Sequence, residues 1–146
     1  MTVKFRIMNK PSFDKRMRER LNETTRNLKR AVRVSSNEVR NEAITSITQN
    51  PRAGTTETRY NPKRTIRISK EGDPPASDTG FLASNIHLIV DGDGLGASVE
   101  SRAHYSVFLE FGTRHMRARP FLQPALEKGK RKYKTMFRQA VKKGIL

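Results

Sequence analysis

The sequence has no cysteine, no tryptophan and only three histidines. Without cysteine, the chain cannot form disulfides, thiolate zinc sites or a cysteine nucleophile. Hydrophobic residues make up 34% of it, below the roughly 45 to 50% typical of globular domains, so a thick core is not expected. No apolar run approaches the roughly 20 residues of a membrane span, and the first ten residues lack the apolar segment of a secretory signal. We therefore expect a soluble protein that is made in a cytoplasm and does not contact a membrane.

The residue patterns of enzymes and metal proteins are also missing. The sequence contains no phosphate-cradling loop, no pair of catalytic carboxylates and no nucleophile next to a base. The histidines do not follow the HExxH spacing of a zinc site. A calcium loop counted from Asp91 would need oxygen ligands where Leu95 and Arg102 stand. We therefore predict that the protein is not an enzyme and holds no cofactor and no metal ion.

Charge is plentiful and unevenly spread. The chain has 146 residues, enough for one domain or one domain with an arm, and its 30 Lys and Arg exceed its 14 Asp and Glu by a formal +16. Residues 1–70 hold 18 bases and 6 acids, residues 71–118 hold 3 and 7, and residues 119–146 hold 9 and 1. An acidic middle can pair with the basic flanks of its own chain or of a neighbouring copy. The net charge alone therefore does not identify nucleic acid as the partner.

Apolar periodicity predicts the first elements. Residues 2–8 alternate apolar and basic side chains, which is typical of a half-buried strand. From Ser12, a candidate N-cap, apolar residues recur at spacings of four or seven and predict an amphipathic helix over 12–49. Such a helix would be about 57 Å long, whereas a compact chain of this size has a radius of gyration of about 15 Å. The helix must bend or reach beyond its own domain.

The middle of the chain predicts mostly extended structure. Residues 50–78 are rich in proline, glycine and threonine and are expected to form a long loop that bears a hairpin or an extended arm. Alternation over 86–90 and 97–99, around an Asp-Gly-Asp-Gly turn, predicts a β-hairpin. The aromatic-rich residues 103–111 predict another strand.

A second apolar stripe predicts a C-terminal helix that begins after Pro120 and ends near Gly144. Its outer face is basic, which is typical either of a solvated helix or of a surface that contacts a polyanion. The candidate polyanion contacts are Lys130, Arg131, Lys132 and Lys134. Together the elements predict a single α+β domain over 1–146. Its long N-terminal helix and basic C-terminal helix would pack on a small, mainly antiparallel sheet, with the loop or arm 50–78 between them.

Two segments carry longer motifs. Residues 79–86 read TGFLASNI, and residues 105–113 read YSVFLEFGT and are followed at 116–126 by MRARPFLQPAL. They resemble the TG.L..SI and Y...LEFGT..M.ARPFL.PAL signatures of the tail-completion or neck proteins of long-tailed phages, prophages and gene transfer agents, the gene-ten-like group. The second motif is long and specific, and the resemblance covers about residues 79–128.

The resemblance implies a small α+β subunit, similar to tail terminators, that closes into a homo-oligomeric ring of six copies where the tail tube meets the head. The implied partners are other copies of the chain, the tail tube protein and neck or connector proteins. The implied location is the neck of the virion, after synthesis in the host bacterial cytoplasm. The residues that the resemblance marks as interface or structural positions are Tyr105, Glu110, Phe111, Gly112, Thr113, Arg117, Arg119, Pro120, Phe121, Leu122 and Pro124.

These residue types suit such a role. Gly112 can take a positive φ at a sharp turn, and the two prolines fix the start of the last helix. Glu110 is expected to form an ion pair with Arg117, with Arg119 or with an arginine of an adjacent copy. Alternatively, the motif only holds a corner of the subunit together.

The rival interpretation is a sequence-nonspecific nucleic-acid-binding protein. The composition favours it, but the sequence has no helix-turn-helix pair, RNP motif, zinc finger or basic-region heptads. In the assembly interpretation, contact with passing DNA would be electrostatic and nonspecific.

Overall fold

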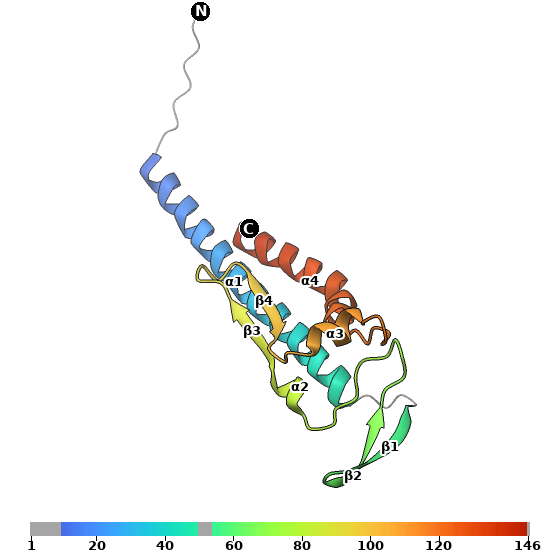
Figure 1. Cartoon of the computed structure of the whole chain (residues 1–146). Coiled ribbons are helices and arrows are strands. Elements are labelled where there is room, and N and C mark those ends of the chain that lie inside the picture. The colour runs from blue at the N-terminus through green and yellow to red at the C-terminus, as the bar shows by residue number, and fades with distance from the viewer. Residues whose placement is uncertain (1–9, 50–53, 146) are drawn as a thin grey trace, which may run out of the picture.

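The structure, a computed structural model, describes residues 10–49 and 54–145. Two long helices run side by side, one hairpin lies against them and a second hairpin stands at one end (Figure 1). The helices are α1 (Lys10–Thr48), α2 (Phe81–Ser84), α3 (Ser106–Phe111) and α4 (Leu122–Ile145), and the strands are β1 (Thr55–Tyr60), β2 (Lys63–Ile68), β3 (Ile86–Val90) and β4 (Ala97–Ser101). The predicted α+β class is confirmed, although the strands form two separate antiparallel pairs rather than one sheet.

Helix α1 follows the predicted apolar stripe. It begins two residues before the expected cap at Ser12 and ends at Thr48, just before Asn50-Pro51, as predicted. The residue before a proline disfavours helical backbone, which explains the end. The buried residues lie in the second half of the helix, on one face: Ala31, Val32, Ser35, Val39, Ala43 and Ile47.

Helix α4 packs antiparallel on the second half of α1. Near its start, Lys128 Nζ lies 2.6 Å from Glu42 Oε1, and near its end Gly144 meets Thr24. A Cβ at position 144 would lie 2.6 Å from the Thr24 Cα, so glycine allows the two helices to approach closely. Because α4 ends here, residues 10–19 of α1 extend beyond it (Figure 1). The sequence predicted that the helix either bends or reaches beyond its domain, and the structure shows the second (Figure 1).

The predicted hairpin over 86–99 is present as β3 and β4, which pair in the register Ile86↔Ser101 to Val90↔Ala97. Its turn closes with the Asp91 amide donating to the Gly96 carbonyl at 3.0 Å. The guanidinium Nε of Arg40 in α1 donates to the Ile86 carbonyl at 2.9 Å and joins the hairpin to the helix.

The predicted loop 50–78 bears a hairpin, formed by β1 and β2. Asp78 accepts hydrogen bonds from Arg64 at 2.9 Å and Arg59 at 3.5 Å, so both strands are held against the segment that follows them. Residues 50–53 of this loop, and the strand predicted over 2–8, lie outside the described residues.

The prediction of a strand over 103–111 is wrong. Residues 106–111 form the short helix α3, entered through a turn in which the Ser106 amide donates to the Ala103 carbonyl at 2.9 Å. Aromatic residues favour strands in general, and six residues are too few to display a helical period. The aromatic side chains here face outward from a helix instead of pairing in a sheet: Phe108 is 54% and Phe111 76% exposed.

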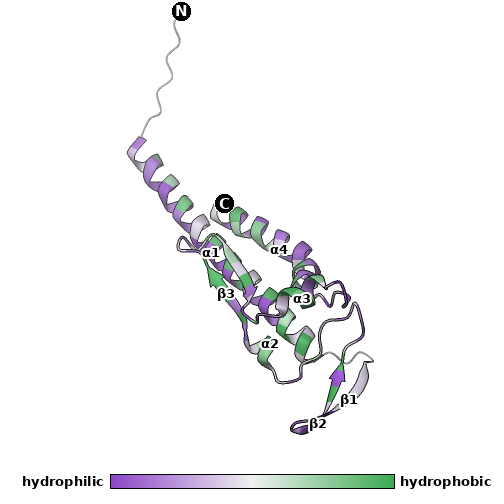
Figure 2. Ribbon diagram, viewed as in Figure 1, coloured by the Kyte–Doolittle hydropathy of each residue, from purple (hydrophilic) through white to green (hydrophobic). Residues whose placement is uncertain are grey.

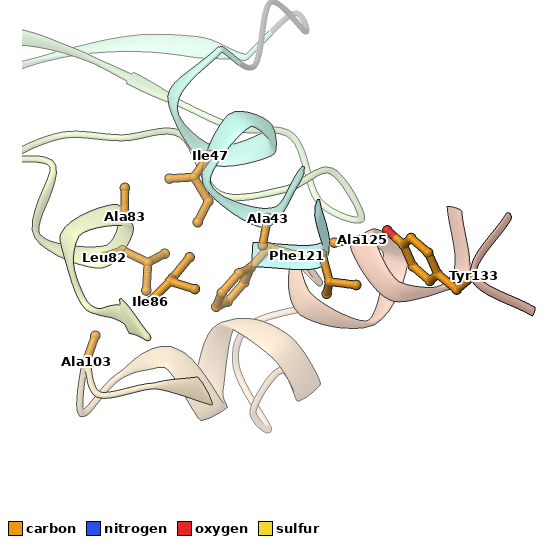
Figure 3. Packing of buried hydrophobic residues seen from close by; sticks show 10 residues of the cluster. Ala43, Ile47, Leu82, Ala83, Ile86, Ala103, Phe121, Ala125 and Tyr133 are labelled. Carbon is orange, nitrogen blue, oxygen red and sulfur yellow. The ribbon is translucent and has the colours of Figure 1, made fainter. Parts of the chain in front are cut away.

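The core joins α1, α2, β3 and α4. Figure 3 shows the Phe121 ring, which is fully buried, beside Ala43 and Ile86. Leu82 and Ala83 of α2 close one end, and Tyr133 of α4 lies at the other. The core is small, as the low apolar content predicts, and it anchors the chain on both sides of the long motif.

Candidate functional site

The long motif forms the corner between α3 and α4, and Glu110 is its central residue. The Glu110 carboxylate accepts three backbone N–H groups at the start of α4: Phe121 at 2.9 Å, Leu122 at 3.1 Å and Gln123 at 2.8 Å. The first amides of a helix have no partners within the helix, and a carboxylate there also interacts favourably with the helix dipole. Glu110 therefore acts as a long-range N-terminal cap for α4.

This geometry corrects the predicted ion pair of Glu110 with Arg117 or Arg119. Within the subunit, Arg117 pairs with Glu71 at 3.5 Å, on the surface. The Arg119 amide donates to the Leu109 carbonyl at 2.6 Å, but its guanidinium Nε is buried without a hydrogen-bond partner among the described residues. The carboxylate instead accepts the backbone amides at the start of α4, because the loop after α3 returns the chain to Glu110.

Gly112 has the expected positive φ, 77°, although it follows a helix rather than a strand. A Cβ at this position would lie 2.8 Å from both the Met116 oxygen and the Ala118 nitrogen, which leaves no room for a side chain. After it, Thr113 pairs with Met116 in an isolated bridge, with the Thr113 amide donating at 2.7 Å. The loop after Gly112 thus folds back on itself and leads into α4.

The remaining motif residues build the start of α4. Pro120 is half-buried just before the helix, Phe121 fills the core, and Leu122 packs against that core as the first helical residue. Pro124 lies exposed in the first helical turn, where a missing N–H costs little. These positions join parts of one subunit.

Tyr105 links the corner to the shorter motif. Its ring lies 6.2 Å from the Phe81 ring and 5.2 Å, edge to face, from the His104 ring. Burial raises the pKa of the Tyr105 hydroxyl, and the nearby Asp78 carboxylate adds to the effect. The neutral hydroxyl is therefore favoured, as expected for a packing residue.

The outer face of the corner is apolar and exposed. Val107, Phe108 and Phe111 are adjacent on the surface of α3, at helical spacings of one, three and four residues, and each is more than half exposed. Large exposed aromatic patches mark interaction sites. The sequence-based site included Phe111 but missed Val107 and Phe108. A helical interpretation of residues 106–111 would have placed all three together.

A second exposed apolar face lies on the first part of α1, along the segment that extends beyond α4 and at the point where α4 ends. Phe13, Met17 and Leu21 are 51%, 45% and 59% exposed. They are spaced four residues apart and continue the stripe that α4 covers farther along the helix, at Val32 and Val39. Figure 2 shows apolar patches alternating with polar ones along the free end of α1.

The four predicted polyanion contacts all lie exposed on α4, but two of them are paired within the subunit. Lys130 contacts Glu127 at 2.8 Å, and Lys132 contacts Glu38 at 2.8 Å. The hydrogen bond to Glu38 raises the pKa of Lys132. Arg131 and Lys134 make no ion pair with another described residue, so they are the freest cations of the four.

Neither metal ligands nor a membrane segment stand out in the part of the chain that the structure describes. Residues 10–49 and 54–145 contain no group of three or more histidine, aspartate or glutamate side chains that could hold an ion. No helix within them is long and apolar enough to cross a bilayer.

Comparison with protein families gives a match. Residues 12–112, from the first turn of α1 to the end of α3, match the family described as "Bacteriophage HK97-gp10, putative tail-component". The chain belongs to this family. The resemblance seen in the motifs is thereby confirmed, and the protein is a structural tail component located in the virion, where it contacts other tail or head proteins. No curated protein and no solved structure matches the chain. The match contains Glu110 and ends before Phe121, so it includes one side of the capped corner.

Proposed function

We propose that this tail component forms a homo-oligomeric ring, of six copies, that completes the tail tube and joins it to the head at the neck. The observation that carries the proposal is the free end of α1, with Phe13 and Met17 exposed along it and Leu21 exposed where α4 ends. Apolar side chains this exposed among the described residues of one subunit would be costly to leave in water in a monomer. A neighbouring copy would cover them.

A second apolar surface supports closure into a ring. The aromatic face of α3, with Phe108 and Phe111, belongs to the corner that the long motif forms and lies on an element far from the free end of α1 (Figure 1). Two different faces on one subunit allow head-to-tail contacts, and such contacts close into a ring when the rotation between copies permits it. In this proposal the subunit's role is structural and not catalytic.

Light scattering coupled to size exclusion tests the proposal, in low and high salt and after nuclease treatment. A discrete oligomer that keeps its mass without nucleic acid is the expected result. A chain that stays monomeric at high concentration, and one copy per neck in cryo-EM images of particles, would contradict the ring. A species that loses its mass on nuclease treatment would favour the nucleic-acid-binding alternative.

A further inference from the structure

A groove runs along the free edge of β4. It has a volume of about 770 Å³, and its walls come from α1, β4 and α4. Its apolar lining consists of Val39, Val99, Leu122, Leu126, Tyr133 and Phe137. Three consecutive strand residues, Ala97 to Val99, all line it, although successive side chains of a strand face opposite ways. The groove therefore follows the edge of the strand, where backbone groups are available.

The register shows which backbone groups these are. The turn bond from Asp91 to Gly96 and the bond from the Arg102 amide to the Asn85 carbonyl mark the hydrogen-bonded pairs of the ladder, which alternate. Ala97 and Val99 fall in the intervening pairs, so their N–H and C=O groups point away from β3. No described residue outside the hairpin forms a backbone hydrogen bond with them. An open strand edge beside an apolar groove is a template for a further strand.

We propose that this groove receives residues 2–8 of a neighbouring copy, which add to β4 as a strand. That segment alternates Val3, Phe5 and Ile7 with Lys4 and Arg6, the pattern of a strand with one buried face. The apolar face would enter the groove on the side of Val99. The basic face would lie outside, on the side of Ser98, which is exposed.

Chain geometry requires the donor to be another copy. Phe5 is five residues from Lys10, so an extended chain places it at most about 18 Å from the start of α1. The first α1 residue that lines the groove is Ser35, which lies 25 residues along the helix, or about 38 Å away. A copy's own segment therefore falls short, whereas the free end of α1 extends away from the rest of its subunit (Figure 1).

This inference rests on the proposed ring. It specifies the contact between successive copies, called the joint below: residues 2–8 of one copy pair with β4 of the next. Exchange of one strand between successive copies, in one direction, is a head-to-tail contact of the kind that closes into a ring. The rim of the groove carries Lys130, Lys134 and Arg138, so an acidic segment of another tail protein is the competing occupant.

Cysteine cross-linking tests the joint, because the natural chain has no cysteine. One chain carries Lys4→Cys or Arg6→Cys, and a second chain carries Ser98→Cys. All three positions lie on the solvent side of the proposed pairing. An added strand would meet Ser98 at a position that is not hydrogen-bonded, where facing side chains are closest. The matched control replaces Ser98→Cys by Thr58→Cys, an equally exposed strand position on β1.

When the two chains are mixed and oxidised, we expect disulfide-linked dimers with Ser98→Cys to exceed those with Thr58→Cys at least tenfold. Deletion of residues 2–8 should weaken self-association at least tenfold and leave the melting temperature of the monomer unchanged. If the oligomer persists after the deletion and cross-linking stays at the control level, the strand exchange is wrong but the ring is not. The same result is expected if the groove instead binds an acidic segment of another tail protein. A full-length chain that never self-associates would overturn the ring itself.

Discussion

The Glu110 carboxylate accepts the backbone N–H of Phe121 at 2.9 Å, although the two residues belong to different helices. Phe121 is fully buried, so the contact fixes the start of α4 to the core at the point where α3 ends. The aromatic surface of the proposed ring depends on this contact, because α3 carries that surface.

The first prediction concerns that cap. Glu110→Ala removes a charged acceptor from three amides, and we expect it to lower the free energy of unfolding by about 2 kcal/mol. Glu110→Gln keeps one carbonyl acceptor and should cost about half as much. The control is Glu127→Ala, whose carboxylate forms its ion pair within the described residues with the exposed Lys130. Urea unfolding followed by circular dichroism measures the difference, and equal effects of Glu110→Ala and Glu127→Ala would contradict the capping role.

Gly112 provides the second prediction. An alanine there meets both the strain of φ 77° and two backbone atoms at 2.8 Å. Gly72→Ala is the matched control, because Gly72 has φ 81° but no atom near the added Cβ. We expect Gly72→Ala to cost about 1 kcal/mol and Gly112→Ala about 3 kcal/mol of folding free energy. Thermal denaturation compares the two, and similar melting temperatures would show that the corner relaxes around the new methyl group.

Periodicity made most of the fold predictable. The α1 stripe up to Ile47, the β3–β4 hairpin with its turn at Asp91, and α4 all follow from apolar spacing over ten or more residues or from turn chemistry. The failures have physical causes. Helix α3 has only six residues, too few to show a helical period. Its aromatic composition therefore led to the prediction of a strand. The groove beside Val99 depends on packing between α1, β4 and α4, which lie far apart in the sequence.

The site was predicted in part. The motif residues come together at one corner, but within the subunit Glu110 caps α4 and does not pair with Arg117 or Arg119. Charge chemistry in a sequence favours an ion pair wherever an acid lies near arginines. The competing backbone amides of Phe121 and Leu122 become visible only when the helix start is located in space.

The third prediction concerns the free end of α1. Met17→Glu places a charge in the exposed apolar stripe, and it should reduce self-association at least tenfold, because a buried unpaired charge is costly. The monomer should melt as the parent does, since Met17 is 45% exposed and lies beyond the end of α4. Asn22→Glu adds the same charge on the opposite face and should leave association unchanged. Sedimentation equilibrium distinguishes the two, and equal weakening by both variants would indicate a general charge effect rather than a contact.

The last prediction concerns the basic face of α4 and the rival interpretation. If DNA passes the ring and touches this face, binding should be nonspecific and should weaken steeply with salt. Replacing Lys130, Arg131, Lys132 and Lys134 together by Gln should lower that affinity and leave the fold intact, because these side chains are exposed.

Two double variants refine that test, since each removes two positive charges. Arg131→Gln with Lys134→Gln removes the two cations that form no ion pair with another described residue, and it should reduce the slope of log affinity against log salt by about 2. Lys130→Gln with Lys132→Gln removes cations already paired with Glu127 and Glu38, and it should change the slope less. Fluorescence anisotropy on DNA of two unrelated sequences measures both slopes. Equal slopes would mean that the DNA responds only to the overall charge. A preference for one sequence that persists in high salt would instead favour a dedicated nucleic-acid-binding protein, because base contacts, unlike phosphate contacts, carry sequence information.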